Sequence, residues 1–103
     1  AEEIGAIADH VHRLGMHLHV DGARLSNAAV GLGTDFSAFT TDAGVDIVSF
    51  GGTKNGLMGA EAIVVFTPAA APGLKFLGKM NMQLASKMRF ISAASAVAAC
   101  VAR

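Results

Sequence analysis

Apolar residues at the start of the chain recur with the period of a helix. They occupy every third or fourth position from the first turn onward: Ile4, Ile7, Ala8, Val11 and Leu14. Glu2 and Glu3 would lie at the positive end of the helix dipole, and Gly15 is placed where a helix can end. The pattern predicts an amphipathic helix with one face turned toward a core.

Three short apolar runs follow, and each is typical of a β-strand. Residues 16–20 alternate between apolar and polar and end at Asp21-Gly22, as a strand followed by a loop would. Residues 45–50 are mostly apolar, and residues 61–66 are apolar at nearly every position. Because a strand that is apolar on both faces belongs in the middle of a covered sheet, we expect the third strand there.

Further helices are predicted between and after these strands. We expect a helix at residues 24–30 that ends at the GLG string of 31–33, and a short helix through Phe36 and Phe39. Residues 82–103 are apolar or small around much of a helical circumference, which predicts one long helix that is buried or packs against a partner. The mixture and order of helices and strands are typical of an α/β layered fold.

Two polar signals stand at the ends of predicted strands. Asp21 follows the first strand, and the Thr53-Lys54 pair follows the second. In α/β sheets, ligands bind beyond the carboxyl ends of the strands. A lysine whose pKa is lowered by desolvation or a neighbouring cation attacks carbonyls and forms a Schiff base. The amine and the carboxylate are therefore candidates for holding one pyridoxal phosphate ring, with the aspartate as partner of the pyridine nitrogen.

Each of these residues also has an interpretation without chemistry. Asp21 before a glycine is a turn signal, Lys54 is typical of an exposed turn, and Arg24 can pair with a surface carboxylate. The glycines at positions 51, 52 and 56 would let the backbone approach a cofactor closely. The combination of residues, rather than any one of them, carries the functional hypothesis.

Composition bounds the size and setting of the domain. The chain has 103 residues, enough for one domain or a piece of one. It is 52% hydrophobic and 16% charged, which is more apolar than an average soluble domain. We therefore expect part of the surface to be covered by chain or subunits outside these residues. Because the chain begins at Ala1 without Met and within a helical pattern, we expect an internal fragment.

Charge and cysteine content argue against several classes of function. The formal net charge is zero and the basic residues are scattered, so we expect no binding of nucleic acid or anionic lipid. No apolar run approaches the roughly 20 residues of a membrane span. The single cysteine, Cys100, is predicted to be buried filler and suits a cytoplasmic location. His17 and His19 share a face of one predicted strand, but no further ligand completes a metal site, so we expect none.

Two strings join the site signals in one pattern: HVDGARLSNAA at residues 19–29 and GVDIVSFGGTKNG at residues 44–56. Together they resemble the low-specificity L-threonine aldolase family of pyridoxal phosphate enzymes, which belong to fold type I. The SKMRF string at 86–90 is similar to the bacterial aldolases. The resemblance implies that residues 1–103 are the central fragment of a single cofactor-binding large domain, a three-layer α/β sandwich with a mostly parallel sheet.

The resemblance also implies a role for each matching residue. Lys54 would be the Schiff-base lysine and Asp21 the partner of the pyridine nitrogen. Arg24 would face the ring hydroxyl near the substrate carboxylate, and Thr53 would support the cofactor phosphate. Two more positions match basic residues that aldolases often keep near the site, and both are also typical of solvated helix charges: Lys79 and Arg89.

The activity that the resemblance implies is cleavage of L-threonine or L-allo-threonine to glycine and an aldehyde, by a homo-oligomer that is a tetramer in the family. The alternatives are another fold type I lyase, acting by β-elimination or on phenylserine, and a non-catalytic α/β scaffold in which Asp21 and Lys54 are turn residues. The family takes its ring-stacking histidine and phosphate-binding glycines from earlier chain, and its substrate-carboxylate arginine from later chain. We therefore expect residues 1–103 alone to be inactive, and they do not identify the general base.

Overall fold

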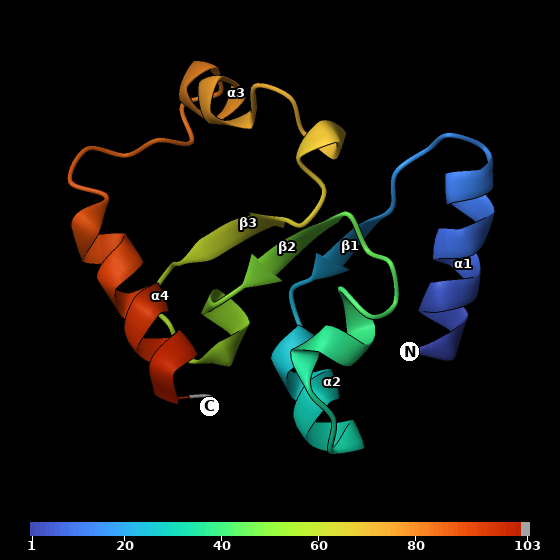
Figure 1. Cartoon of the computed structure of the whole chain (residues 1–103). Helices are drawn as coiled ribbons and strands as arrows, with labels where there is room; N and C mark the ends of the chain where they lie inside the picture. The colour runs from blue at the N-terminus through green and yellow to red at the C-terminus, as the bar shows by residue number, and fades with distance from the viewer. Residues whose placement is uncertain (102–103) are drawn as a thin grey trace.

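A three-stranded sheet forms the centre of the structure (Figure 1). This computed structural model describes the backbone of residues 1–101 and the side chains of residues 1–97. The strands are β1 (His19–Gly22), β2 (Ile47–Gly51) and β3 (Glu61–Val65). β2 lies in the middle, parallel to β1 and antiparallel to β3.

Four helices surround the sheet: α1 (Glu2–Arg13), α2 (Leu25–Leu32), α3 (Leu74–Met80) and α4 (Arg89–Val101). Three short 3-10 turns connect the elements: η1 (Phe36–Phe39), η2 (Thr53–Asn55) and η3 (Pro68–Ala70). In Figure 1, α1 lies on the side of β1, whereas α3 and α4 lie on the side of β3. Among the described residues, no helix has the length and hydropathy needed to cross a membrane.

The hydrophobic core lies on one face of the sheet, against α2 and η1. Val48 of β2 is its most buried large side chain, with 2% of its surface exposed. The other members come from α2, η1 and the residues before β2: Leu25, Ala29, Phe39 and Val45. The rings of Phe36 and Phe50 meet edge to face at 5.8 Å, a favoured aromatic geometry. Because burying one such side chain stabilises by about 1.5–3 kcal/mol, this cluster holds α2 and η1 against the sheet.

Most predicted elements are present, with shifted ends. The first helix, the second helix and the short third helix are confirmed. Gly33 ends α2 with a φ of 60°, as the GLG string predicts. β1 starts later than predicted and includes Asp21 and Gly22, because its pairing with β2 continues until Gly22 lies beside Phe50. Asp21 is thus inside the strand rather than after it.

The predicted position of the third strand is wrong for the described part of the chain. β3 is an edge strand instead of the central one, and Ile63 on it is 57% exposed. The α/β character is confirmed, but the described strands form a mixed sheet because β3 runs antiparallel to β2. The three-layer sandwich with a mostly parallel sheet remains a prediction.

The single long helix predicted for residues 82–103 is also wrong. Met82 and Lys87 have φ values of 56° and 59°, a left-handed conformation that a right-handed helix cannot contain. The helix therefore begins only at Arg89. The start of this helix is not buried by the described residues, since Phe90 is 68% exposed. The side chain of Cys100 and residues 102–103 lie outside the described part of the chain.

Asp46 joins three segments of the chain just before β2 begins. It is buried, with 4% of its surface exposed. Its Oδ2 atom accepts a hydrogen bond from the backbone N–H of Leu18 at 2.8 Å and lies 2.8 Å from Nε2 of His12. Its own carbonyl oxygen accepts the N–H of Phe66, just after β3. This residue therefore holds α1, the start of β1 and the end of β3 together.

Hydrogen bonds keep the Asp46 carboxylate ionised. Burial raises the pKa of Asp46, but the hydrogen bonds from the Thr67 side chain, the Leu18 N–H and His12 outweigh it. The pKa therefore lies well below its ordinary value. A carboxyl group with a lowered folded-state pKa stabilises the fold above its unfolded-state pKa, and this contribution is lost as the pH falls further.

Asp46→Asn tests this arrangement. The amide keeps the size and one acceptor oxygen but removes the charge, so we expect the free energy of unfolding at pH 7 to fall by about 1–3 kcal/mol. In the parent protein, the contribution of Asp46 declines once the pH is below about 3.9, the ordinary value for the unfolded chain. The difference between variant and parent, measured by urea unfolding, should therefore shrink at pH 3.

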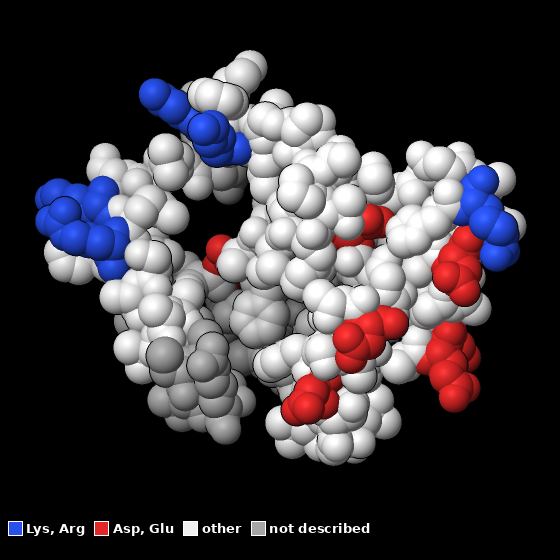
Figure 2. Space-filling view, viewed as in Figure 1, with Lys and Arg blue, Asp and Glu red and all other residues white. Residues whose placement is uncertain are grey.

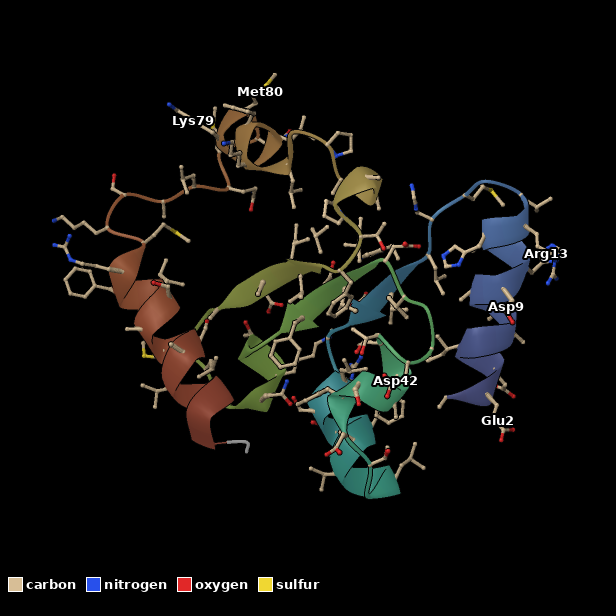
Figure 3. The ribbon with its side chains drawn as sticks, in the orientation of Figure 1. Glu2, Asp9, Arg13, Asp42, Lys79 and Met80 are labelled. Carbon is tan, nitrogen blue, oxygen red and sulfur yellow. The ribbon has the colours of Figure 1, made fainter. Side chains whose placement is uncertain are left out.

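Asp9→Asn is the matched control, because Asp9 lies on the exposed surface of α1 (Figure 3). It should change the free energy of unfolding by less than about 0.5 kcal/mol. Equal stability of the Asp46→Asn variant and the parent at pH 7 would contradict the stabilising role of Asp46.

Candidate active site

The carboxyl ends of β1 and β2 lie at the same edge of the sheet. Because the two strands are parallel, Asp21 lies beside Ser49 and both strands leave the sheet in the same direction. Lys54 lies in η2, three residues after the end of β2, and Arg24 directly precedes α2. The structure therefore places all four residues singled out from the sequence at this edge: Asp21, Arg24, Thr53 and Lys54.

A tight turn fixes the backbone around Lys54. The N–H groups of Asn55 and Leu57 both donate to the carbonyl oxygen of Gly52, at 2.9 and 3.2 Å. The amide side chain of Asn55 donates to the carbonyl oxygen of Gly51. The Lys54 side chain is exposed and forms no ion pair with any residue in the described part of the chain. The turn thus fixes the lysine backbone and leaves its amine accessible.

Two glycines in this turn are required by the chain itself. A Cβ atom on Gly51 would lie 2.9 Å from Cα of Ala23, in the segment after β1. A Cβ atom on Gly52 would lie 2.5 Å from a Leu57 methyl and 2.6 Å from the Ala60 carbonyl oxygen. The sequence led us to expect room for a cofactor here. The structure shows instead that glycine at these positions lets the end of β2 lie close to the segment after β1 and to residues 57–60.

The Asp21 carboxylate projects from the sheet face opposite to the core. A Cβ atom on the next residue, Gly22, would contact Val48 of the core, and side chains alternate between faces along a strand. Asp21 is exposed, and its Oδ1 atom accepts the N–H of Ala23 at 3.1 Å. This bond is the turn contact expected of an aspartate before glycine. The carboxylate makes no other hydrogen bond to a described residue, so one oxygen is available to a ligand.

Other polar side chains line the same face of the sheet. His19 Nε2 lies 2.8 Å from the Ser49 hydroxyl, which joins β1 to β2. The Thr53 hydroxyl donates to Oε1 of Glu61 at 2.7 Å, which joins the Lys54 turn to β3. This face therefore combines these polar groups with apolar residues of β2 and β3: Ile47, Ile63 and Val65.

Lys54 borders a hollow on the core side of the sheet edge. The hollow lies between α2, η1 and the exposed part of β3, and its apolar lining includes Phe36, Phe50, Leu57 and Val64. Asp21, Arg24 and Thr53 do not line it. The structure thus brings Asp21 and Lys54 to one edge but not to one pocket. The Lys54 amine has no ion-pair partner among the described residues, and its four-carbon stem is flexible.

The remaining basic residues lie apart from this edge or lack partners. Arg24 forms no ion pair among the described residues, which leaves its guanidinium available. Lys79 extends away from the sheet at the outer end of α3 (Figure 3). The Arg89 guanidinium lies 5.0 Å from the ring of its neighbour Phe90 at the start of α4. Figure 2 shows the basic atoms of this face as separate groups at its periphery, with no continuous basic patch.

Three residues that shape the two ends of β2 were not found from the sequence. Asn55 had one signal, its position before Gly56, which adopts a left-handed φ of 89°. Asp46 had another, since a carboxylate within a mostly apolar run is unusual. In the sequence, Glu61 is typical of the polar start of a strand. No neighbouring residue indicates that it accepts a hydrogen bond from Thr53.

The fold and this edge define an α/β domain with candidate ligand-binding groups at the ends of parallel strands. The chain belongs to the beta-eliminating lyase family, whose model matches residues 1–102. It is 47% identical, over 92 residues and 89% of its length, to a low specificity L-threonine aldolase of Pseudomonas aeruginosa. The identity to a protein of the same name from Pseudomonas sp. strain NCIMB 10558 is also 47% over 92 residues. The chain spans 27% of the length of each relative.

Gly52→Ala tests whether the turn requires glycine. The added methyl group would meet a backbone carbonyl oxygen that cannot rotate away, so we expect a loss of about 1–3 kcal/mol in the free energy of unfolding. The accompanying shift of the turn should also change the rate at which Lys54 reacts with an amine-specific reagent, measured by peptide mass mapping.

Gly59→Ala is the matched control in the same connection between β2 and β3. A Cβ atom there meets nothing within 4 Å. This variant should keep the stability and the Lys54 reactivity of the parent. If Gly52→Ala were as stable as Gly59→Ala, the packing role assigned to Gly52 would be wrong.

Proposed function

We propose that the protein is a pyridoxal phosphate-dependent lyase that cleaves L-threonine or L-allo-threonine to glycine and an aldehyde. The observation that carries this proposal is the parallel pairing of β1 and β2, which brings Asp21 and Lys54 to one sheet edge. The two Pseudomonas relatives named low specificity L-threonine aldolase support the substrate class. We also propose that residues 1–103 belong to a single cofactor-binding large domain.

The groups at this edge fit pyridoxal phosphate. The cofactor is an aldehyde, and Lys54 offers an exposed amine without an ion pair among the described residues. The pyridine nitrogen requires an acid partner, and Asp21 has an exposed carboxylate with one oxygen left by its turn contact. When bound, the cofactor accepts the electron pair that remains on Cα after the Cα–Cβ bond breaks.

The cleavage needs two proton movements and an anchor for the substrate. The β-hydroxyl loses a proton as the aldehyde forms, and Cα gains one to become glycine, so protons balance over the reaction. Arg24, exposed and unpaired in the described chain, is the proposed contact on the ring-hydroxyl side of the cofactor, near the substrate carboxylate. The family resemblance implies that Thr53 binds the cofactor phosphate. In the structure, however, the Thr53 hydroxyl donates a hydrogen bond to Glu61.

We further propose that the protein is a cytoplasmic homo-oligomer, a tetramer as the family resemblance implies. The support is the apolar surface that α3 and the segments after it leave uncovered in the described chain. Its most exposed members are Phe76 and Val97, each at 63%, Phe90 at 68%, Met80 at 76% and Met82 at 91%. Apolar surface of this extent is typical of contacts with other chain segments or subunits.

A second candidate activity is β-elimination, which the name of the matching family favours. The two activities give different products from L-threonine. Aldol cleavage yields glycine and acetaldehyde, whereas β-elimination of the hydroxyl yields 2-oxobutyrate and ammonia. A product assay on the full-length protein with L-threonine distinguishes them, and a protein that stays colourless with pyridoxal phosphate would favour the non-catalytic scaffold.

Borohydride reduction of the full-length protein with pyridoxal phosphate, followed by peptide mass mapping, tests the central residue. We expect the reduced cofactor on Lys54 and its loss in Lys54→Ala, with a fall in cleavage rate of at least about 10³-fold. Lys75→Ala is the control, since Lys75 is an exposed lysine on α3. A parent protein that carries the label on another lysine, or none, would contradict the proposal.

A further inference from the structure

The Thr53 hydroxyl donates a hydrogen bond to another side chain of the protein. Its Oγ1 atom donates to Oε1 of Glu61 at 2.7 Å. Glu61 is the first residue of β3 and lies opposite Gly51 in the antiparallel pairing of β2 with β3. This bond therefore ties the turn that carries Lys54 to the neighbouring strand.

Gly51 gives the Glu61 side chain its position. A Cβ atom on Gly51 would lie 3.0 Å from Oε2 of Glu61. Because glycine has no Cβ, the carboxylate can lie close over the end of β2 and reach Thr53 from there. Both side chains are exposed, and their contact depends on three residues from two strands and a turn.

A phosphate contact and the Glu61 contact exclude one another at Thr53. A threonine hydroxyl has one proton to donate, and here that proton goes to a carboxylate. A phosphate group that took Glu61's place as acceptor at Thr53 would also bring two anions together, which is unfavourable at short range. The geometry favours the hydrogen bond to Glu61 over a contact with the phosphate.

We propose that Thr53 and Glu61 are positioning residues that anchor the Lys54 turn to β3, and that Thr53 does not bind the cofactor phosphate. This inference rests on the proposed function for its consequence, because the anchored residue is the proposed cofactor lysine. The anchor acts together with the Asn55 side chain, which holds the other side of the same turn through Gly51. Lys54 is thus fixed from both flanking residues.

The test compares pyridoxal phosphate with pyridoxal, which lacks the phosphate, in the full-length protein. Affinities of both aldehydes are measured by the absorbance of the bound form for Thr53→Val, Glu61→Ala and the double variant. If the two residues form an anchor, each single variant should weaken both aldehydes by the same factor, about 3- to 10-fold, because a hydrogen bond to a charged group is lost. The double variant should be no weaker than either single variant.

Controls separate the hydrogen bond from general damage. Thr53→Ser restores the hydroxyl and should recover most of the lost affinity. Thr34→Val makes the same change at an exposed threonine outside the site and should leave both affinities as in the parent. If Thr53→Val weakens pyridoxal phosphate alone, the anchor is overturned and a contact of Thr53 with the phosphate is favoured. If Glu61→Ala changes neither affinity, the anchor is also overturned.

Hydrogen exchange tests the anchor without any cofactor. The N–H groups of Asn55 and Leu57 bond within the turn and report its stability. Exchange in the peptide that covers residues 51–57 should be faster in Thr53→Val and Glu61→Ala, but not in Thr34→Val. A parent protein that fails to bind either aldehyde at Lys54 would refute the proposed function, while the exchange rates would still decide the anchor. Unchanged exchange in both Thr53→Val and Glu61→Ala would overturn the anchor.

Discussion

The parallel pairing of β1 with β2 is the constraint on which the candidate site depends. Two parallel strands that lie side by side end at the same edge, so Asp21 and the Lys54 turn lie at one edge although they are 33 positions apart in the sequence. α2, η1 and the core around Val48 fill the connection between the two strands. The long connection is therefore also what buries the core face of the sheet.

The two edges of this sheet are held by different means. At the amino end of β2, the buried Asp46 carboxylate collects hydrogen bonds from residues before β1 and from α1. At the carboxyl end, glycines allow close backbone contact, and the Asn55 and Thr53 side chains hold the turn. The charged group lies at the edge without the candidate site, while the site edge keeps its lysine, aspartate and arginine accessible.

The sequence predicted the features that depend on neighbouring residues. Helical spacing located α1, and short apolar runs located the three strands. It did not predict features set by distant contacts, such as the antiparallel edge position of β3 or the bond from Thr53 to Glu61. The break before α4 was missed because Met82 and Lys87 adopt positive φ angles without the glycine that usually marks them.

We propose that Asp21 and Lys54 hold one cofactor ring from two adjacent strand ends. The most direct measurement is the ¹⁵N NMR shift of pyridoxal phosphate labelled at the ring nitrogen and bound to the full-length protein, in the parent and in Asp21→Ala. We expect a protonated nitrogen in the parent at neutral pH and loss of that proton in the variant. The same protonation state in both proteins would contradict it, because the carboxylate would then not face the ring.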